Sequence, residues 1–218
     1  MKNGTGKLAL FDDNNKLIFE VEYLNGKIWN GKGDNYEIIN GNGKCREYNE
    51  QFGYLIYEGE YKNGERNGYG KEYNEHGKLI FEGEYKNGEK NGYGKEYDEY
   101  NHIRFEGEYK NGEKNGFGKY FCYNILIFEG EYKNGKKNGH GIFYHIGRNI
   151  EYEGEYKYGR RNGKGKEYNK EGKLIYEGYY KYDLKNGKGK LYNENGDIIY
   201  DGDFKNGEII SKNSLNAY

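Results

Sequence analysis

The sequence predicts an all-β protein, an elongated single-layer antiparallel β-meander of tandem β-hairpin repeats with a period of mostly 24 residues. Three observations predict this fold. A glycine flanked by acidic and aromatic residues recurs at nearly constant spacing, apolar and polar residues alternate around it, and Asn-Gly sequences separate the alternating stretches. Helix is a poor alternative, because glycine is frequent throughout and costs about 1 kcal/mol relative to alanine inside a helix.

The repeat is defined by (Tyr/Phe)-(Glu/Asp)-Gly-(Glu/Tyr/Asp)-(Tyr/Phe), followed by a Gly-x-Gly sequence. Successive copies of its central glycine are separated by 24, 24, 23, 24, 24 and 24 residues. Six full repeats therefore occupy residues 57–199, and residues 200–218 form a partial repeat and a C-terminal cap. The central glycines are Gly59, Gly83, Gly107, Gly130, Gly154, Gly178 and Gly202.

The N-terminal residues 1–56 carry degenerate copies of the same pattern. Phe19–Tyr23 matches the core of the repeat with Val21 in the glycine position, and a shortened hairpin is expected to turn at Asn40-Gly41. No change of composition marks a second domain, so we expect residues 1–218 to form a single repeat array.

One hairpin illustrates the expected local structure. In the first strand, Phe81 and Tyr85 share one face and Glu84 points to the other, as in a half-buried strand. Asn87-Gly88 is a turn sequence, because both residues tolerate positive φ. Strand glycines such as Gly94 are expected to leave room for an aromatic ring from a neighbouring strand, so that each repeat makes this contact only when its neighbour is present.

Composition indicates what the core is made of. Apolar residues are only 33% of the chain, but aromatic residues reach 18% and include 28 tyrosines. We therefore expect a core of aromatic rings whose hydroxyls lie at its rim. The net charge is −1, yet residues 128–190 hold 15 Lys/Arg against 9 Asp/Glu. That excess is either a solvated surface or a basic binding surface.

The sequence predicts no catalytic site, no metal site, no cofactor and no small-molecule substrate. Its Gly-rich sequences lack the Gly-Lys-Ser/Thr of a phosphate-binding loop, and they recur in every repeat. Cys45 and Cys122 lie about three repeats apart, too far for an internal disulfide. Because no apolar run is long enough to span a bilayer and no signal sequence is evident, we expect a cytoplasmic protein, with membrane or cytoskeletal association as an alternative.

The pattern Tyr-Glu-Gly-Glu-Tyr-Lys-Asn-Gly-x-x-Asn-Gly-x-Gly resembles the MORN repeat (membrane occupation and recognition nexus). Matching cores begin at Tyr57, Phe81, Phe105, Phe128, Tyr152 and Tyr176. The resemblance implies a solenoid rod with roles in scaffolding, in binding partner peptides and in attachment near membranes. The Gly-Lys-Leu-Ile connection between repeats, as at Gly77–Ile80, also resembles a variant found in bacterial repeat proteins proposed as antitoxins.

Two surfaces are candidates for binding. The first is the aromatic face, which we expect to form the core and also to hold a partner protein or peptide. The second is a basic edge of stacked turns, which suits an anionic membrane surface. The aromatic candidates are Tyr61, Tyr85, Tyr109, Tyr132, Tyr156, Tyr180, Phe81, Phe105 and Phe128. The basic candidates are Lys136, Lys137, Arg160, Arg161, Lys164, Lys185 and Lys188.

The leading hypothesis is a non-enzymatic scaffold or adaptor that binds a partner protein along the aromatic face. The alternatives are a peripheral membrane tether acting through residues 128–190 and an antitoxin-like neutraliser of a partner protein. A homodimer formed through a terminal edge strand is a further expectation, with residues 208–211 as its contact. Specific nucleic-acid binding ranks below all of these.

Overall fold

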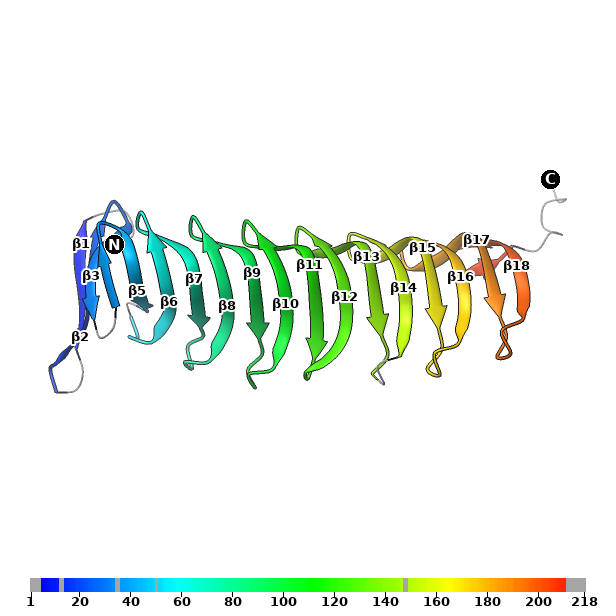
Figure 1. Cartoon of the computed structure of the whole chain (residues 1–218), viewed down its shortest axis with the longest axis horizontal. Helices are drawn as coiled ribbons and strands as arrows, with labels where there is room; N and C mark the ends of the chain where they lie inside the picture. Colours follow the sequence, from blue (N-terminus) through cyan, green and yellow to red (C-terminus); the bar gives the residue numbers. More distant parts are fainter. Residues whose placement is uncertain (1–4, 12–13, 34–35, 50, 147–148, 211–218) are drawn as a thin grey trace. The chain divides into compact units, whose positions relative to one another are not determined.

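The computed structural model of the chain describes residues 5–11, 14–33, 36–49, 51–146 and 149–210. The chain divides into two compact units, Met1–Gly112 (unit 1) and Glu113–Tyr218 (unit 2). All regular secondary structure in these described ranges is β-strand, and within each unit every strand pairs antiparallel with the next one in the sequence (Figure 1).

The strands of unit 1 are β1 (Gly6–Phe11), β2 (Leu17–Leu24), β3 (Lys27–Gly33), β4 (Tyr36–Ile39), β5 (Asn42–Tyr48), β6 (Leu55–Lys62), β7 (Glu65–Tyr73), β8 (Leu79–Lys86), β9 (Glu89–Tyr97) and β10 (Ile103–Lys110). Those of unit 2 are β11 (Glu113–Cys122), β12 (Ile125–Lys133), β13 (Lys136–Tyr144), β14 (Ile150–Lys157), β15 (Arg160–Tyr168), β16 (Leu174–Lys181), β17 (Leu184–Tyr192), β18 (Ile198–Lys205) and β19 (Glu208–Ile209).

The predicted all-β fold of consecutive hairpins at about 24-residue spacing is confirmed. The shortened N-terminal hairpin is β4–β5, which turns at Asn40-Gly41 as expected. At the C-terminal end, β19 pairs with β18, and the remainder of the predicted cap, 211–218, lies outside the described residues. The expected dimer contact through a terminal strand therefore stays a prediction.

Asn87 and Gly88 join β8 to β9, and both have positive φ, 52° and 83°. A two-residue turn with positive φ at both positions is of type I′, whose twist matches that of the strands it joins. Asn and Gly adopt this conformation more readily than other residues. The Gly88 amide also donates to the carbonyl of Arg66 in the preceding repeat (2.9 Å), so the turn links neighbouring hairpins.

The first strand of each hairpin buries its aromatic residues. In β8, Phe81 and Tyr85 are only 1% and 4% exposed, while Glu84 on the opposite face is exposed. Gly83 pairs with Gly94 of β9. A Cβ on Gly94 would lie 2.5 Å from Cζ of Phe81, so only glycine leaves room for the ring.

The contact between ring and glycine lies within a hairpin, which corrects the expectation that it links neighbouring repeats. Phe81 and Gly94 belong to the same repeat. The next repeat is contacted ring to ring instead, because Phe81 meets Tyr109 edge-on with centroids 5.3 Å apart at 84°. Such pairs contribute about 0.5–1.5 kcal/mol beyond the area they bury. Equivalent pairs are Tyr57–Tyr85, Phe128–Tyr156, Tyr152–Tyr180 and Tyr176–Phe204.

We expect Gly94→Ala to lower the free energy of unfolding by about 2–3 kcal/mol, because overpacking a filled core costs roughly 1–3 kcal/mol. Phe81→Leu, which removes the ring, should relieve part of that loss in the double variant. Urea unfolding followed by circular dichroism measures all three variants, and a coupling of about 1 kcal/mol or more is expected.

Gly77→Ala is the matched control. Gly77 has a positive φ (70°), and no heavy atom lies within 4 Å of its Cβ position. Its loss of stability should therefore come from the backbone alone, at about 1–2 kcal/mol, and should not change when Phe81 is replaced. Additive effects of Gly94→Ala and Phe81→Leu would contradict the packing described above.

Candidate functional site

In each unit, one face of the sheet carries the aromatic residues predicted to bind a partner, and we call it the ring face. All nine of these residues are buried, with exposures between 0% and 8%. They form the core, and their role in partner binding stays a prediction. In unit 1 they are Tyr61, Tyr85, Tyr109, Phe81 and Phe105, and in unit 2 they are Tyr132, Tyr156, Tyr180 and Phe128.

Cationic side chains cover the rings in unit 1. The guanidinium of Arg66 lies 4.0 Å from the ring centroid of Tyr57, and the ammonium of Lys90 lies 4.0 Å from that of Phe81. Glu72 joins the two cations, at 3.0 Å from Arg66 and 2.9 Å from Lys90. A single-layer sheet has no second layer to cover its core, so these paired charges and their aliphatic stems exclude water from the rings.

The same cover recurs in unit 2. Glu167 accepts from Arg161 and Lys185, each at 2.8 Å, and Lys185 lies 4.4 Å from the ring centroid of Tyr176. The glutamates of this cover were missed by the sequence analysis. The sequence nevertheless contains a signal for these glutamates. In several repeats, Gly-x-Gly is preceded by a cation two or three residues earlier and followed by a glutamate two residues later.

Lys137 in unit 2 lacks this arrangement, because aromatic residues replace both glutamates beside Phe128. Phe128 pairs with Tyr120 of β11 on one side and with Phe143 of β13 on the other. In the later repeats, Glu167 occupies such a position, because it pairs with both Tyr152 and Tyr176. The Lys137 ammonium lies 4.1 Å from the ring centroid of Phe128, 4.9 Å from that of Phe143 and 5.6 Å from that of Tyr156.

Rings rather than a carboxylate therefore surround the charge of Lys137. Among the described residues none forms an ion pair with its ammonium. Burial lowers the pKa of Lys137, and the negative charge of Asp183 offsets that effect only in part. An acidic group placed against Lys137 from outside the chain would have a desolvated cation to pair with.

The structure does not bring the seven predicted basic residues to one edge. Lys137, Arg161 and Lys185 lie over the rings. Lys164 and Lys188 directly precede Gly165 and Gly189, whose Cβ positions point at the rings. Because successive residues of a strand face opposite sides, these two lysines lie on the opposite face. Lys136 and Arg160 begin β13 and β15 and are exposed there. Binding of an anionic membrane surface by this set stays a prediction.

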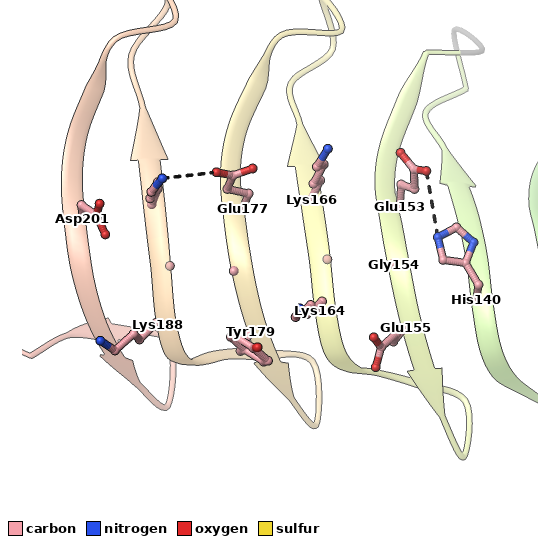
Figure 2. A pocket seen from close by; sticks show the side chains of 14 residues that line it. His140, Glu153, Gly154, Glu155, Lys164, Lys166, Glu177, Tyr179, Lys188 and Asp201 are labelled. Atoms are coloured by element: carbon pink, nitrogen blue, oxygen red, sulfur yellow. Dashed lines mark ion pairs between the residues drawn. The ribbon is translucent and has the colours of Figure 1, made fainter.

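The opposite face of unit 2 carries two rows of mostly charged side chains (Figure 2). The rows run across β13–β18 on either side of the paired glycines and border a groove of ≈ 440 Å³. Opposite charges pair across strands within a row, as Lys190 does with Glu177 at 3.8 Å. In the other row, Tyr179 stands between Lys164 and Lys188 (Figure 2).

Burial changes the acid–base behaviour of the core tyrosines. It raises the pKa of Tyr176 to about 12, and it also raises the pKa of Tyr57 and Tyr152. An unfolded tyrosine ionises near pH 10. Between that pH and the folded pKa, the folded chain binds more protons than the unfolded chain, so stability is complete below about pH 10 and is lost as the pH rises.

Other chemistry is not assembled in the part of the chain that the structure describes. No group of three His, Cys, Asp or Glu residues there is placed to hold a metal ion. The Cys45 thiol is buried, and burial raises its pKa to about 12, so it is a poor nucleophile. The described segments also contain no helix of a length and apolarity that would carry it through a bilayer.

Comparison with protein families identifies a repeat family. The model of the MORN repeat matches six segments, 57–75, 81–99, 105–124, 128–146, 152–173 and 176–198. Together they cover more than half of the chain, and no catalytic family is assigned to it. Among curated proteins, no match to the chain is found.

We expect the protein to unfold cooperatively as the pH rises from about 10 to 12. Each buried tyrosine withdraws about 1.4 kcal/mol of stability per pH unit over this interval. Absorbance at 295 nm reports tyrosine ionisation, and far-ultraviolet circular dichroism reports the sheet. The part of the absorbance change that comes from the buried tyrosines should coincide with the loss of the sheet signal.

Tyr176→Phe tests the cause, because phenylalanine occupies the equivalent position at Phe81, Phe105 and Phe128. The variant has one fewer buried group to ionise, so its alkaline midpoint should be higher than that of the wild type. Ionisation of all tyrosines near pH 10 with an unchanged sheet signal would contradict the account.

Proposed function

Because the chain belongs to the MORN repeat family, we propose that it is a non-enzymatic scaffold or adaptor that binds a partner protein along the ring face. The observation that carries the proposal is the break in the charged cover at Lys137. Elsewhere on this face, glutamates such as Glu72 and Glu167 neutralise the cations from within the chain. A carboxylate of the partner therefore gains the most binding free energy at Lys137, where no glutamate of the chain pairs with the cation.

The break offers two kinds of contact side by side. Phe143 and Tyr120 are only partly buried, so their rings present apolar surface beside the ammonium of Lys137. Aromatic residues with little rotational freedom are typical anchors of protein interfaces. The chemistry favours a partner segment that carries a carboxylate next to an aromatic or aliphatic side chain.

Repetition itself argues for a scaffold. An enzyme needs one set of groups that differs from its surroundings, whereas the rings, cations and glutamates of this face recur with the period of the repeat. A repeated surface instead holds an extended partner at several points, and a local departure such as Phe143 sets where along the surface the partner lies. Scaffolding is the function that this arrangement supports best.

Phe143→Glu tests the proposal. The equivalent residue of the next repeat is Glu167, so the variant should fold. The new carboxylate should pair with the ammonium of Lys137 and thereby raise the pKa of Lys137. The tagged full-length protein is used to capture a partner from its source cells, and the purified partner is then titrated by biolayer interferometry. We expect at least tenfold weaker binding by Phe143→Glu.

Leu191→Glu is the matched control. Leu191 has the same place in β17 that Phe143 has in β13, but the neighbouring Lys185 is already paired with Glu167. Its binding should stay within twofold of the wild type. Equal affinities of the wild type and Phe143→Glu, or the failure of any captured protein to bind saturably once purified, would overturn the proposal.

A further inference from the structure

On the face opposite the rings, a glutamate carboxylate lies over a glycine in most repeats. In β8–β9, Glu84 extends over Gly92, whose φ is +108°, and accepts a hydrogen bond from the Tyr93 amide at 3.4 Å. The pairing of the two strands is irregular between Gly83 and Tyr85, so the amide after the glycine turns to a side-chain acceptor. We call this place the carboxylate position.

Other repeats fill the carboxylate position in the same way. Glu60 accepts from the Tyr69 amide at 3.3 Å, and Glu131 accepts from the His140 amide at 3.1 Å. In the fifth repeat, a Cβ on Gly163 would meet the carboxylate of Glu155. In the first, second and fourth repeats the fold thus places an amide where a carboxylate accepts from it.

The sixth repeat departs from this pattern. Its strands β16 and β17 keep the irregular pairing, between Gly178 and Tyr180, and Gly187 keeps a positive φ of 98°. The residue at the glutamate's place is Tyr179. Only its Cβ and Cγ lie within 4 Å of the Cβ position of Gly187, at 3.4 and 3.9 Å. Tyr179 has no carboxylate to offer the Lys188 amide, which is the equivalent donor.

The carboxylate position of this repeat opens into a groove of ≈ 620 Å³. The residues that line it lie between 157 and 188, all within the described part of unit 2, and include Lys157, Lys181 and Lys188 but no aspartate or glutamate. The ammonium of Lys164 lies nearby, 5.8 Å from the ring centroid of Tyr179. The carboxylate of Glu155 lies over Gly163, which lines the groove, but the lysines outnumber it, so the field in the groove favours an anion.

Two exposed tyrosines border the same groove in an unusual backbone conformation. Tyr158 and Tyr182 are 68% and 57% exposed, and both have positive φ, 54° and 52°. Bulky L residues rarely adopt this conformation, and no burial of these rings offsets the strain. The corresponding turn residues of other repeats are Asn63, Asn87, Asn111, Asn134 and Asn206.

We propose that this groove binds an acidic segment of a partner protein, with one of its Asp or Glu side chains in the carboxylate position over Gly187. The carboxylate accepts from the Lys188 amide, as Glu84 accepts from the Tyr93 amide within the chain. The lysines around it neutralise the segment, and the exposed tyrosine rings pack against its aliphatic or aromatic side chains.

The chemistry of the ligand follows from the glutamate that occupies the carboxylate position in other repeats. The carboxylate position holds the side chain of a glutamate in other repeats, and the groove adds cations and rings beside it. A peptide supplies a carboxylate and packing groups together, which a free anion does not. The groove lies on the face opposite Lys137 and does not depend on the binding proposed for the ring face.

Tyr179→Glu is the decisive variant, because it restores the residue present at Glu60, Glu84, Glu131 and Glu155. The probe is fluorescein-labelled hexaglutamate, titrated into the full chain at low salt and followed by fluorescence anisotropy. We expect saturable binding by the wild type and at least tenfold weaker binding by Tyr179→Glu. The amide resonance of Lys188 should move downfield with the probe in the wild type alone.

Lys133→Gln and hexaglutamine are the matched controls. Lys133 is an exposed lysine of unit 2 outside the groove, so its removal should change affinity by less than twofold, and hexaglutamine should not bind. Affinity of Tyr179→Glu within twofold of the wild type overturns the proposal.

Anionic ligands other than a peptide are outcomes of the same test. Inorganic phosphate that displaces hexaglutamate at equal concentration overturns the assignment to a peptide in favour of a free anion. Vesicles with phosphatidylserine that bind in a Tyr179-dependent manner while hexaglutamate does not overturn it in favour of a lipid surface. Because the assay uses a synthetic peptide, its result is separate from capture of a partner on the ring face.

Discussion

The aromatic ring that lies across a glycine of the next strand is the interaction on which the rest of each unit depends. It requires glycine at Gly94 and its equivalents, since a Cβ would collide with the ring. The same ring meets a tyrosine of the next hairpin edge-on, as Phe81 meets Tyr109. One residue thus connects the two strands of its own hairpin and the next hairpin, which explains how a chain with 33% apolar residues builds a core.

A core one layer thick must be covered by side chains from its own strands, and this has functional consequences. Arg66, Lys90 and Glu72 form such a cover from residues of the repeat itself. Where a repeat departs from the pattern without losing its fold, the departure removes a carboxylate that other repeats provide. Phe143 does so on the ring face, and Tyr179 does so on the opposite face. These two departures are the places at which we propose that a partner binds.

The sequence predicts much of this architecture, because period, alternation and turn chemistry are local properties. The turn at Asn87-Gly88, the buried face of β8 and the glycine beneath a ring all follow from residue types at fixed spacing. The placement of the cations does not follow from residue types at fixed spacing. Strict alternation pairs Tyr85 with Gly92, but the irregular pairing of β8 and β9 brings Lys90 opposite Tyr85 instead. A residue expected at a turn edge then covers a ring, as Lys137 does.

A double-mutant cycle between rings of adjacent hairpins tests the central claim most directly. Phe128 and Tyr156 meet edge-on with centroids 5.2 Å apart, in neighbouring repeats of unit 2. Phe128→Leu, Tyr156→Leu and the double variant are unfolded with urea, and their free energies of unfolding are compared. The account predicts a favourable coupling of about 0.5–1.5 kcal/mol between the two rings. A coupling indistinguishable from zero would show that the rings fill space independently and would contradict the account.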